Sequence, residues 1–230
     1  MYTYADDTTL VITARTTHEL QLLAQSELSA LINYFHTNNL VPNAAKTNFT
    51  VFYPITKYRQ IELKIGNTYI KQNKSAKLLG IYVQDDMKHH KTITDIIRKL
   101  QPTIFNLRHA TKLLPTKYMR DEYFTHIYPH LINNIAVWGT PDPTKTYIQP
   151  LIRVQKKIVR ILKNVPPGTH TAPLMAELGI LNMTNLYTLR VAAEMHPYIY
   201  PTREINRPDH YHNYVSIAQI HEHDTRQSRD

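Results

Sequence analysis

The hydrophobic pattern of this sequence changes its period at about Lys91, and this change limits the possible fold more than any other feature. Before Lys91, short apolar runs with strong β-propensity are bounded by turn residues. After it, apolar residues recur with a helical period as far as His196. The chain has 230 residues, which is enough for two units that each have a core. We therefore expect an α+β fold: an α+β unit over residues 1–84, then an all-helical unit over residues 91–196.

The first unit is predicted to combine one helix with antiparallel strands. A capping box, Thr16-Thr17-His18-Glu19, opens the helix, and Asn38-Asn39 ends it. Its apolar stripe consists of Leu20, Leu23, Ala24, Leu28, Leu31, Ile32 and Phe35. Strands are expected at 1–14, as a hairpin, and around 49–52, 61–65 and 76–83, with Gly66-Asn67 as a hairpin turn.

The second unit is predicted to contain helices separated by prolines. Their expected ranges are 91–111, 116–136, 147–163 and 184–196. Residues 197–230 are rich in Pro, His, Tyr, Arg and Asp without a period, and we expect a disordered tail there.

Composition excludes several classes of protein. The chain has no cysteine, so disulfides, cysteine-based zinc sites and thiol catalysis are excluded. No signal peptide and no apolar run long enough for a membrane helix is present. We therefore expect an intracellular protein, nuclear or cytoplasmic, that is not secreted and has no membrane partner.

The net charge of +9 is concentrated in the middle of the chain. Residues 1–90, 91–163 and 164–230 have formal charges of +2, +9 and −2. A localised basic block indicates a polyanionic partner, most commonly nucleic acid. Within it, residues 147–163 predict an amphipathic helix whose basic side chains share an arc of about 120°. These are Arg153, Lys156, Lys157, Arg160 and Lys163. We favour contact with nucleic-acid phosphates over an ordinary solvated face.

Two acids stand side by side in the segment Tyr4-Ala5-Asp6-Asp7. Strands are depleted in aspartate and direct neighbouring residues to opposite faces, so the pair fits a hairpin tip. At a tip both carboxylates can face outward, and hard oxygen ligands of this kind suit Mg²⁺. The alternative is an ordinary surface β-turn, in which aspartate is common.

Six segments, taken in order, resemble the reverse transcriptases of non-LTR (LINE or jockey-like) retrotransposons. They are Tyr4 to Val11, Asn39 to Thr47, Ala76 to Val83 with Asp85-Asp86, Tyr128 to Gly139, Ile148 to Arg160, and His170 to Leu181. The first three segments are similar, in order, to the family's palm hairpin, its Gly-Leu-x-x-Asn-x-x-Lys-Thr segment and its primer grip. The last three are similar to the part of the thumb ending in Trp-Gly, the Leu-x-x-Gln-x-Lys-x-x-Arg helix, and the stretch after that helix. Asn39 stands where glycine is common in the family.

The resemblance implies a polymerase palm ending at residue 84 and a helical thumb over residues 91–196. In the intact enzyme, Asp6 and Asp7 would bind two Mg²⁺ ions for nucleotidyl transfer from a dNTP to a primer 3′-hydroxyl. Lys46 would lie near the departing pyrophosphate and act as a general acid, the alternative being a solvated lysine at the entrance to a strand.

The resemblance also assigns nucleic-acid contacts. Tyr4 would pack beneath the primer end, and Leu79 and Gly80 would shape the primer grip. The basic face of 147–163 would hold the RNA–DNA hybrid formed on an RNA template.

The family's first catalytic aspartate and its nucleotide-selecting segment would lie upstream of Met1. We therefore expect this chain alone to be inactive as a polymerase. A rival hypothesis is a catalytically inactive, transposon-derived nucleic-acid-binding protein or remnant.

Overall fold

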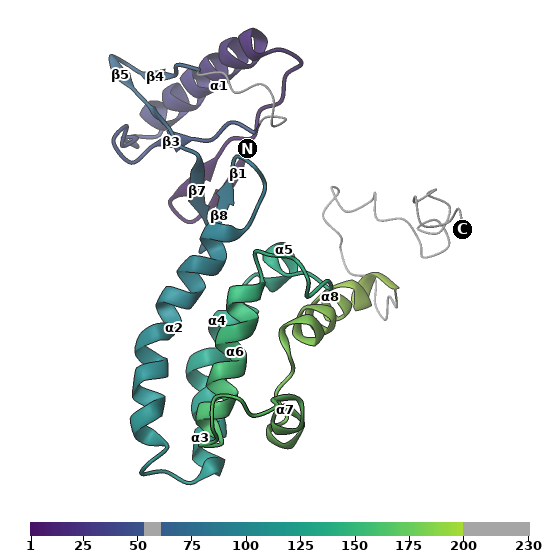
Figure 1. Ribbon diagram of the computed structural model, residues 1–230. Helices are drawn as coiled ribbons and strands as arrows, with labels where there is room; N and C mark the ends of the chain where they lie inside the picture. The colour runs from purple at the N-terminus through teal and green to yellow at the C-terminus, as the bar shows by residue number, and fades with distance from the viewer. Residues whose placement is uncertain (53–60, 200–230) are drawn as a thin grey trace, which may run out of the picture. The chain divides into compact units, whose positions relative to one another are not determined.

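The computed structural model describes residues 1–52 and 61–199, and it divides the chain into two compact units, Met1–Thr92 and Ile93–Asp230 (Figure 1). The architecture is mixed α+β, with strands in the first unit and helices in the second. Of the tail predicted from residue 197, residues 200–230 lie outside the described part of the chain. Residues 197–199 continue the last helix instead of beginning a tail.

The first unit packs one long helix, α1 (Thr17–Thr37), on short strands. The strands are β1 (Tyr2–Tyr4), β2 (Asp7–Thr9), β3 (Asn48–Phe49), β4 (Lys64–Ile65), β5 (Thr68–Tyr69), β6 (Lys71–Gln72), β7 (Ser75–Leu78) and β8 (Ile81–Gln84). Within the described residues they form four separate two-stranded ladders. The ladders β1–β2, β4–β5 and β7–β8 are antiparallel, and β3–β6 is parallel. The antiparallel pairing of three ladders agrees with the prediction, whereas the parallel β3–β6 ladder departs from it. The division into ladders was not predicted, because strands of two to four residues have little edge to share.

Both ends of α1 follow the sequence signals. The Glu19 N–H donates to Thr16 Oγ1 at 3.1 Å, and Glu19 Oε2 accepts from the Arg15 N–H at 3.1 Å, one residue further back than in the usual capping box. At the other end Asn39 adopts φ +56°, and the Leu40 N–H closes on the Phe35 carbonyl at 2.8 Å. This is a Schellman ending, in which glycine is common and asparagine is tolerated.

The core of the first unit lies between α1 and the strands, where α1 contacts β4 (Figure 1). Its buried members are Ala24, Leu28, Leu63 and Ile70, with Ile12, Ile32, Phe49 and Ile65 packed around them. Leu23 was predicted to widen the apolar stripe of α1, but its side chain is exposed. The interior therefore covers a narrower face of α1 than the sequence pattern indicates.

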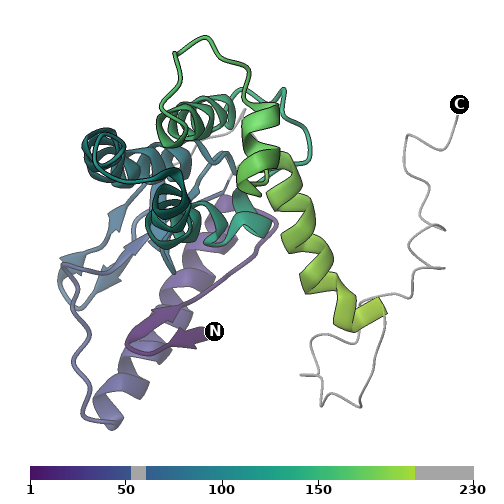
Figure 2. The same cartoon turned by 90° about the horizontal axis from the view of Figure 1, so that it is seen from below.

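The second unit is helical. It contains α2 (His90–Ala110, which begins just before the boundary), α3 (Thr116–Glu122), the π-helix η1 (Tyr123–Ile127), α4 (Tyr128–Ile132), α5 (Ile135–Trp138), α6 (Gln149–Leu162), α7 (Ala172–Leu178) and α8 (Met183–Ile199). Figure 2 shows α2, the α3 to α4 segment and α6 as neighbouring helices seen nearly along their axes. The fully buried side chains between them include Leu100, Leu107, Met119, Tyr123, Leu151 and Ile158.

The helix predicted over 116–136 is interrupted twice. Pro129 has no N–H to continue the regular ladder, and just before it the Tyr128 N–H bonds to the Tyr123 carbonyl in the wider π pattern. Asn134 then adopts φ +53°, so α5 starts as a separate turn. The helices α2, α6 and α8 agree with the predicted ranges within three residues at each end, whereas α7 was not predicted.

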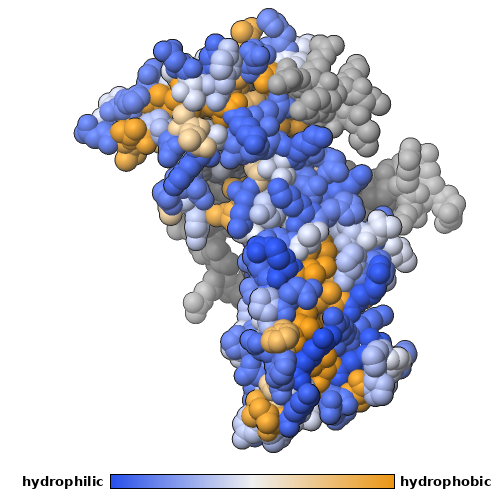
Figure 3. Space-filling view, turned by 60° about the vertical axis from the view of Figure 1, so that its left-hand side comes forward, coloured by the Kyte–Doolittle hydropathy of each residue, from blue (hydrophilic) through white to orange (hydrophobic). Residues whose placement is uncertain are grey.

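The face of the helical unit that Figure 3 shows is mostly hydrophilic. The side that bears α2 faces the viewer in Figure 3, and apolar side chains appear there as a narrow strip and isolated groups. No helix in the described part of the chain is both long enough and apolar enough to cross a membrane.

Candidate functional site

The two neighbouring aspartates lie at the tip of the β1–β2 hairpin, as predicted. Tyr4 pairs with Asp7, so Ala5 and Asp6 form a two-residue turn. Ala5 adopts φ +51°, a conformation that costs an L-residue roughly 1–2 kcal/mol and that glycine usually takes in such turns. Backbone strain of this kind is concentrated at functional sites, where it fixes the direction of neighbouring side chains.

Both carboxylates are on the surface. Asp6 and Asp7 are exposed, and neither forms an ion pair with any residue of 1–52 or 61–199. Two unengaged carboxylates fit a Mg²⁺ ion, which takes one or two protein oxygens and completes its shell with water and phosphate. No group of three or more metal-ligating side chains is found among the described residues. The hairpin therefore supplies two carboxylates and a fixed turn, with Tyr4 beside them at 67% exposure.

Lys46 lies in a tightly bonded turn. Asn43 Oδ1 accepts from the N–H groups of Ala45 at 3.0 Å and Lys46 at 3.2 Å, and Thr47 Oγ1 donates to the Asn43 carbonyl at 2.8 Å. The turn holds the backbone of Lys46 while its side chain stays exposed. Within the described segments, no hydrogen bond or ion pair joins Lys46 to Asp6 or Asp7, so the structure does not bring these predicted residues into contact.

The β7–β8 hairpin turns at Leu79-Gly80, both of which have positive φ, +44° and +91°. Positive φ at both positions is the type I′ pattern, whose twist matches that of the strands. Leu79 is half exposed at this tip. The predicted primer-binding pair is thus the turn itself.

One face of the same hairpin bears a cationic cluster that sequence reasoning missed. Lys77 lies directly opposite Tyr82, and its Nζ is 5.9 Å from the centre of the Tyr82 ring. Lys91 Nζ approaches the same ring at 4.4 Å and donates to Ser75 Oγ at 2.6 Å. The pairing of Lys77 with Tyr82 could have been inferred from the sequence, because a two-residue turn at Leu79-Gly80 fixes the strand register and places these two residues opposite each other.

The basic face of α6 is only partly free. Arg153, Lys156 and Lys157 are exposed, whereas the opposite face buries Leu151, Ile158 and Leu162. The guanidinium Nε of Arg160 donates to the Thr169 carbonyl at 2.8 Å. Lys163 Nζ forms an ion pair with Glu177 Oε1 at 2.6 Å and is 18% exposed. Of the five predicted residues, three therefore remain fully available to a ligand. Arg160 can offer a ligand only the part of its guanidinium that Thr169 does not use, and Lys163 is paired with a residue of α7.

The buried side of α6 is fixed by a polar contact. Gln155 Nε2 donates to the Leu181 carbonyl at 2.8 Å and to the Tyr123 hydroxyl at 3.2 Å. Burial raises the pKa of Tyr123 to about 12, although the Gln155 hydrogen bond acts in the opposite direction. Because these contacts set the rotation of α6, they also set the direction of its three free cations.

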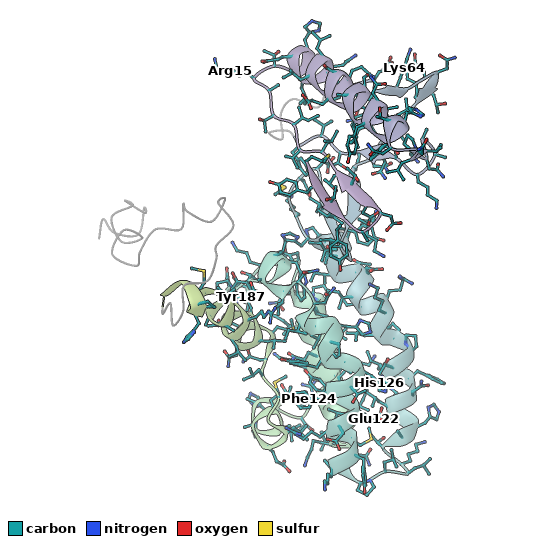
Figure 4. The ribbon with its side chains drawn as sticks, turned by 180° about the vertical axis from the view of Figure 1, so that it is seen from behind. Arg15, Lys64, Glu122, Phe124, His126 and Tyr187 are labelled. Atoms are coloured by element: carbon teal, nitrogen blue, oxygen red, sulfur yellow. The ribbon has the colours of Figure 1, made fainter. Side chains whose placement is uncertain are left out.

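A side chain near the π-helix links α3 to α7. Arg120 Nε donates to the Leu178 carbonyl at 2.8 Å, and its guanidinium lies 4.7 Å from the centre of the Phe124 ring. Glu122 Oε2 and His126 Nε2 lie 3.5 Å apart on the surface; these two residues and Phe124 are labelled in Figure 4. The arginine links α3 to α7, and both helices contact α6.

No protein-family model, curated protein or solved structure matches the chain.

Proposed function

We propose that the chain is the C-terminal part of a non-LTR retrotransposon reverse transcriptase, whose helical unit binds the backbone of an RNA–DNA hybrid. Under this proposal residues 1–84 are the end of the palm and residues 91–196 are the thumb. The observation that carries it is the α6 face, where Arg153, Lys156 and Lys157 are exposed on a helix held rigidly from beneath. Clustered cations on a fixed helix give the sequence-independent phosphate binding that a polymerase needs.

The β1–β2 hairpin supports the polymerase part of the proposal. Asp6 and Asp7 are exposed oxygen ligands on a strained turn, and Tyr4 offers an exposed ring next to them. When bound, Mg²⁺ ions supply charge stabilisation for the attacking and leaving oxygens of phosphoryl transfer. Asp6 and Asp7 would hold them, and Lys46 would donate a proton to the departing pyrophosphate of a dNTP. Leu79 and Gly80 would support the primer strand.

A second candidate is a catalytically inactive nucleic-acid-binding protein derived from a transposon. It is favoured by the absence of a third metal-ligating side chain beside Asp6 and Asp7 among the described residues. Both candidates bind nucleic acid through α6, and they differ in what the hairpin does. Primer extension with Mg²⁺ by this chain alone is expected to be undetectable; sustained Mg²⁺-dependent synthesis would overturn the view that two carboxylates are insufficient.

Binding of a fluorescein-labelled RNA–DNA hybrid tests the α6 interface. The variant Arg153→Glu/Lys156→Glu/Lys157→Glu is expected to lose most of the affinity. The matched control is Lys88→Glu/Lys145→Glu/Arg190→Glu, which makes the same change in net charge at exposed positions outside α6. The control should bind nearly as well as the unmodified chain. Equal losses in the two variants would mean that overall charge, and not the α6 face, holds the hybrid.

A further inference from the structure

A second basic segment of the helical unit contains no acid at all. Between Asp95 and Asp121 the sequence has six Lys or Arg residues and neither Asp nor Glu. This segment forms most of α2, the turn after it and the start of α3. It lies apart in sequence from α6, and the proposed function assigns nothing to it.

The side chains of α2 named below lie on two different faces of the helix. Ile93, Ile96, Leu100, Ile104 and Leu107 are buried, at the spacing of one helix face. On the other face Phe105, Arg108 and His109 are exposed, and Lys112 is exposed in the turn that follows α2. Residues three and four apart are neighbours on a helix surface, so the first three side chains adjoin one another. The turn stays bonded to the end of the helix, because the N–H groups of Thr111 and Lys112 donate to the carbonyls of Leu107 and His109. The four exposed side chains are called here the Phe105 strip.

The cations of the Phe105 strip are available. Earlier on α2, Arg98 and Lys99 are held by Asp95, at 2.8 and 2.9 Å. By contrast, no ion pair within residues 1–52 and 61–199 involves Arg108 or Lys112. The strip therefore presents positive charge that the described part of the chain leaves uncompensated.

The aromatic member of the strip is held in place and faces outward. Phe105 is 63% exposed, whereas the opposite face of α2 is buried. Its ring lies 4.7 Å, centre to centre, from that of His109, and the His109 ring nitrogen Nδ1 is 3.0 Å from the Phe105 carbonyl. The contact limits the rotamers of Phe105 and leaves much of its ring open to solvent.

We infer that the Phe105 strip binds single-stranded nucleic acid. An exposed aromatic ring beside free cations is an arrangement that unpaired strands recognise: a base stacks on the ring, and the phosphates that follow it contact Arg108 and Lys112. A duplex cannot use the ring in this way, because its bases are already stacked. The inference deepens the proposed function, on which it rests, by adding a site for an unpaired strand to the α6 site for the hybrid. Stacking and phosphate contact do not distinguish RNA from DNA, so both should bind with similar affinity.

The test uses the full chain with fluorescein-labelled 12-mers of U and of dT, followed by anisotropy. Phe105→Ala should weaken binding of both about tenfold, within the range expected for one stacked base. Binding of the RNA–DNA hybrid should stay unchanged. Tyr34→Ala is the matched control, since Tyr34 is an exposed aromatic residue of similar accessibility, 57%, on α1. This control should bind the 12-mers as the unmodified chain does.

A second variant reports stacking directly. Phe105→Trp should retain affinity, and its exposed indole should be quenched by the 12-mers, while Trp138, the only native tryptophan, is buried and should be unaffected. If Phe105→Ala binds the 12-mers as tightly as the unmodified chain, or if Phe105→Trp shows no quenching, the inference is wrong. Failure of the hybrid to bind, with the 12-mers still sensitive to Phe105, would instead refute only the α6 interface.

Discussion

Gly139 is the residue whose replacement tests the packing of the helical unit most sharply. It follows Trp138 at the end of α5, and its backbone is extended, with φ −73° and ψ 176°, so any residue could adopt it. The obstacle to a side chain is steric. A Cβ built there lies 2.5 Å from the Ile135 carbonyl oxygen, 2.5 Å from Tyr187 Cδ2 and 2.9 Å from Ile135 Cγ1.

The size of the effect follows from these distances. Carbon atoms in contact are normally about 3.5–4.0 Å apart, so a methyl group would overlap Tyr187 by about 1 Å or more. The Ile135 oxygen belongs to the backbone and cannot move aside without disturbing α5. Tyr187, labelled in Figure 4, belongs to α8, which contacts α5. Overpacking of this kind costs about 1–3 kcal/mol, and a clash with backbone favours the upper end.

The assay is urea unfolding of the full chain, followed by the fluorescence of Trp138. This tryptophan is fully buried in the same unit, and its indole N–H donates to the Asn133 carbonyl at 2.7 Å. Gly139→Ala should lower the free energy of unfolding by about 3 kcal/mol, or the melting temperature by roughly 10–20 °C. Gly168→Ala is the matched control, because no atom lies within 4 Å of its Cβ and its φ is not positive. If the two variants are equally stable, the close approach of α5 and α8 at Gly139 is wrong.

Two further predictions concern stability. Burial raises the pKa of Tyr123 from 10.0 to about 12, so its neutral phenol contributes fully to the free energy of unfolding below pH 10, and this contribution is lost as the pH rises towards 12. Tyr123→Phe should therefore flatten the alkaline loss of stability measured by urea unfolding at a series of pH values. An unchanged pH profile would contradict this role of Tyr123. Asn39 has φ +56°, so Asn39→Ala should destabilise the first unit by about 1 kcal/mol, whereas Asn39→Gly should not. Circular dichroism during thermal unfolding measures both variants, and equal effects would count against the left-handed ending of α1.

Local signals predicted the parts of the fold that local physics decides. The capping box at Thr16, the ending at Asn39 and the turn at Gly66 each depend on a few neighbouring residues, and each is found where it was expected. The ranges of α2 and α6 followed from the apolar period, since a buried face must repeat every turn. The α+β class followed from the change of period at Lys91.

Features set by distant contacts were not predicted. Gln155 was not predicted to be buried, and only the fold shows that its amide meets Tyr123 and Leu181. The same limit applies to the site. Composition and helical spacing placed five cations on α6, but the contacts of Arg160 with Thr169 and of Lys163 with Glu177 depend on the loop and helix that follow.

If the α6 face binds nucleic-acid phosphates, the affinity for the RNA–DNA hybrid must fall with salt concentration in proportion to the number of phosphate contacts. Each phosphate contact contributes about 0.9 to the slope of log affinity against log salt concentration, so removing three should reduce the slope by about 2.7. This reduction is expected for Arg153→Glu/Lys156→Glu/Lys157→Glu, and an unchanged slope for Lys88→Glu/Lys145→Glu/Arg190→Glu. Equal slopes for the α6 variant and the unmodified chain would mean that these three cations do not contact phosphates.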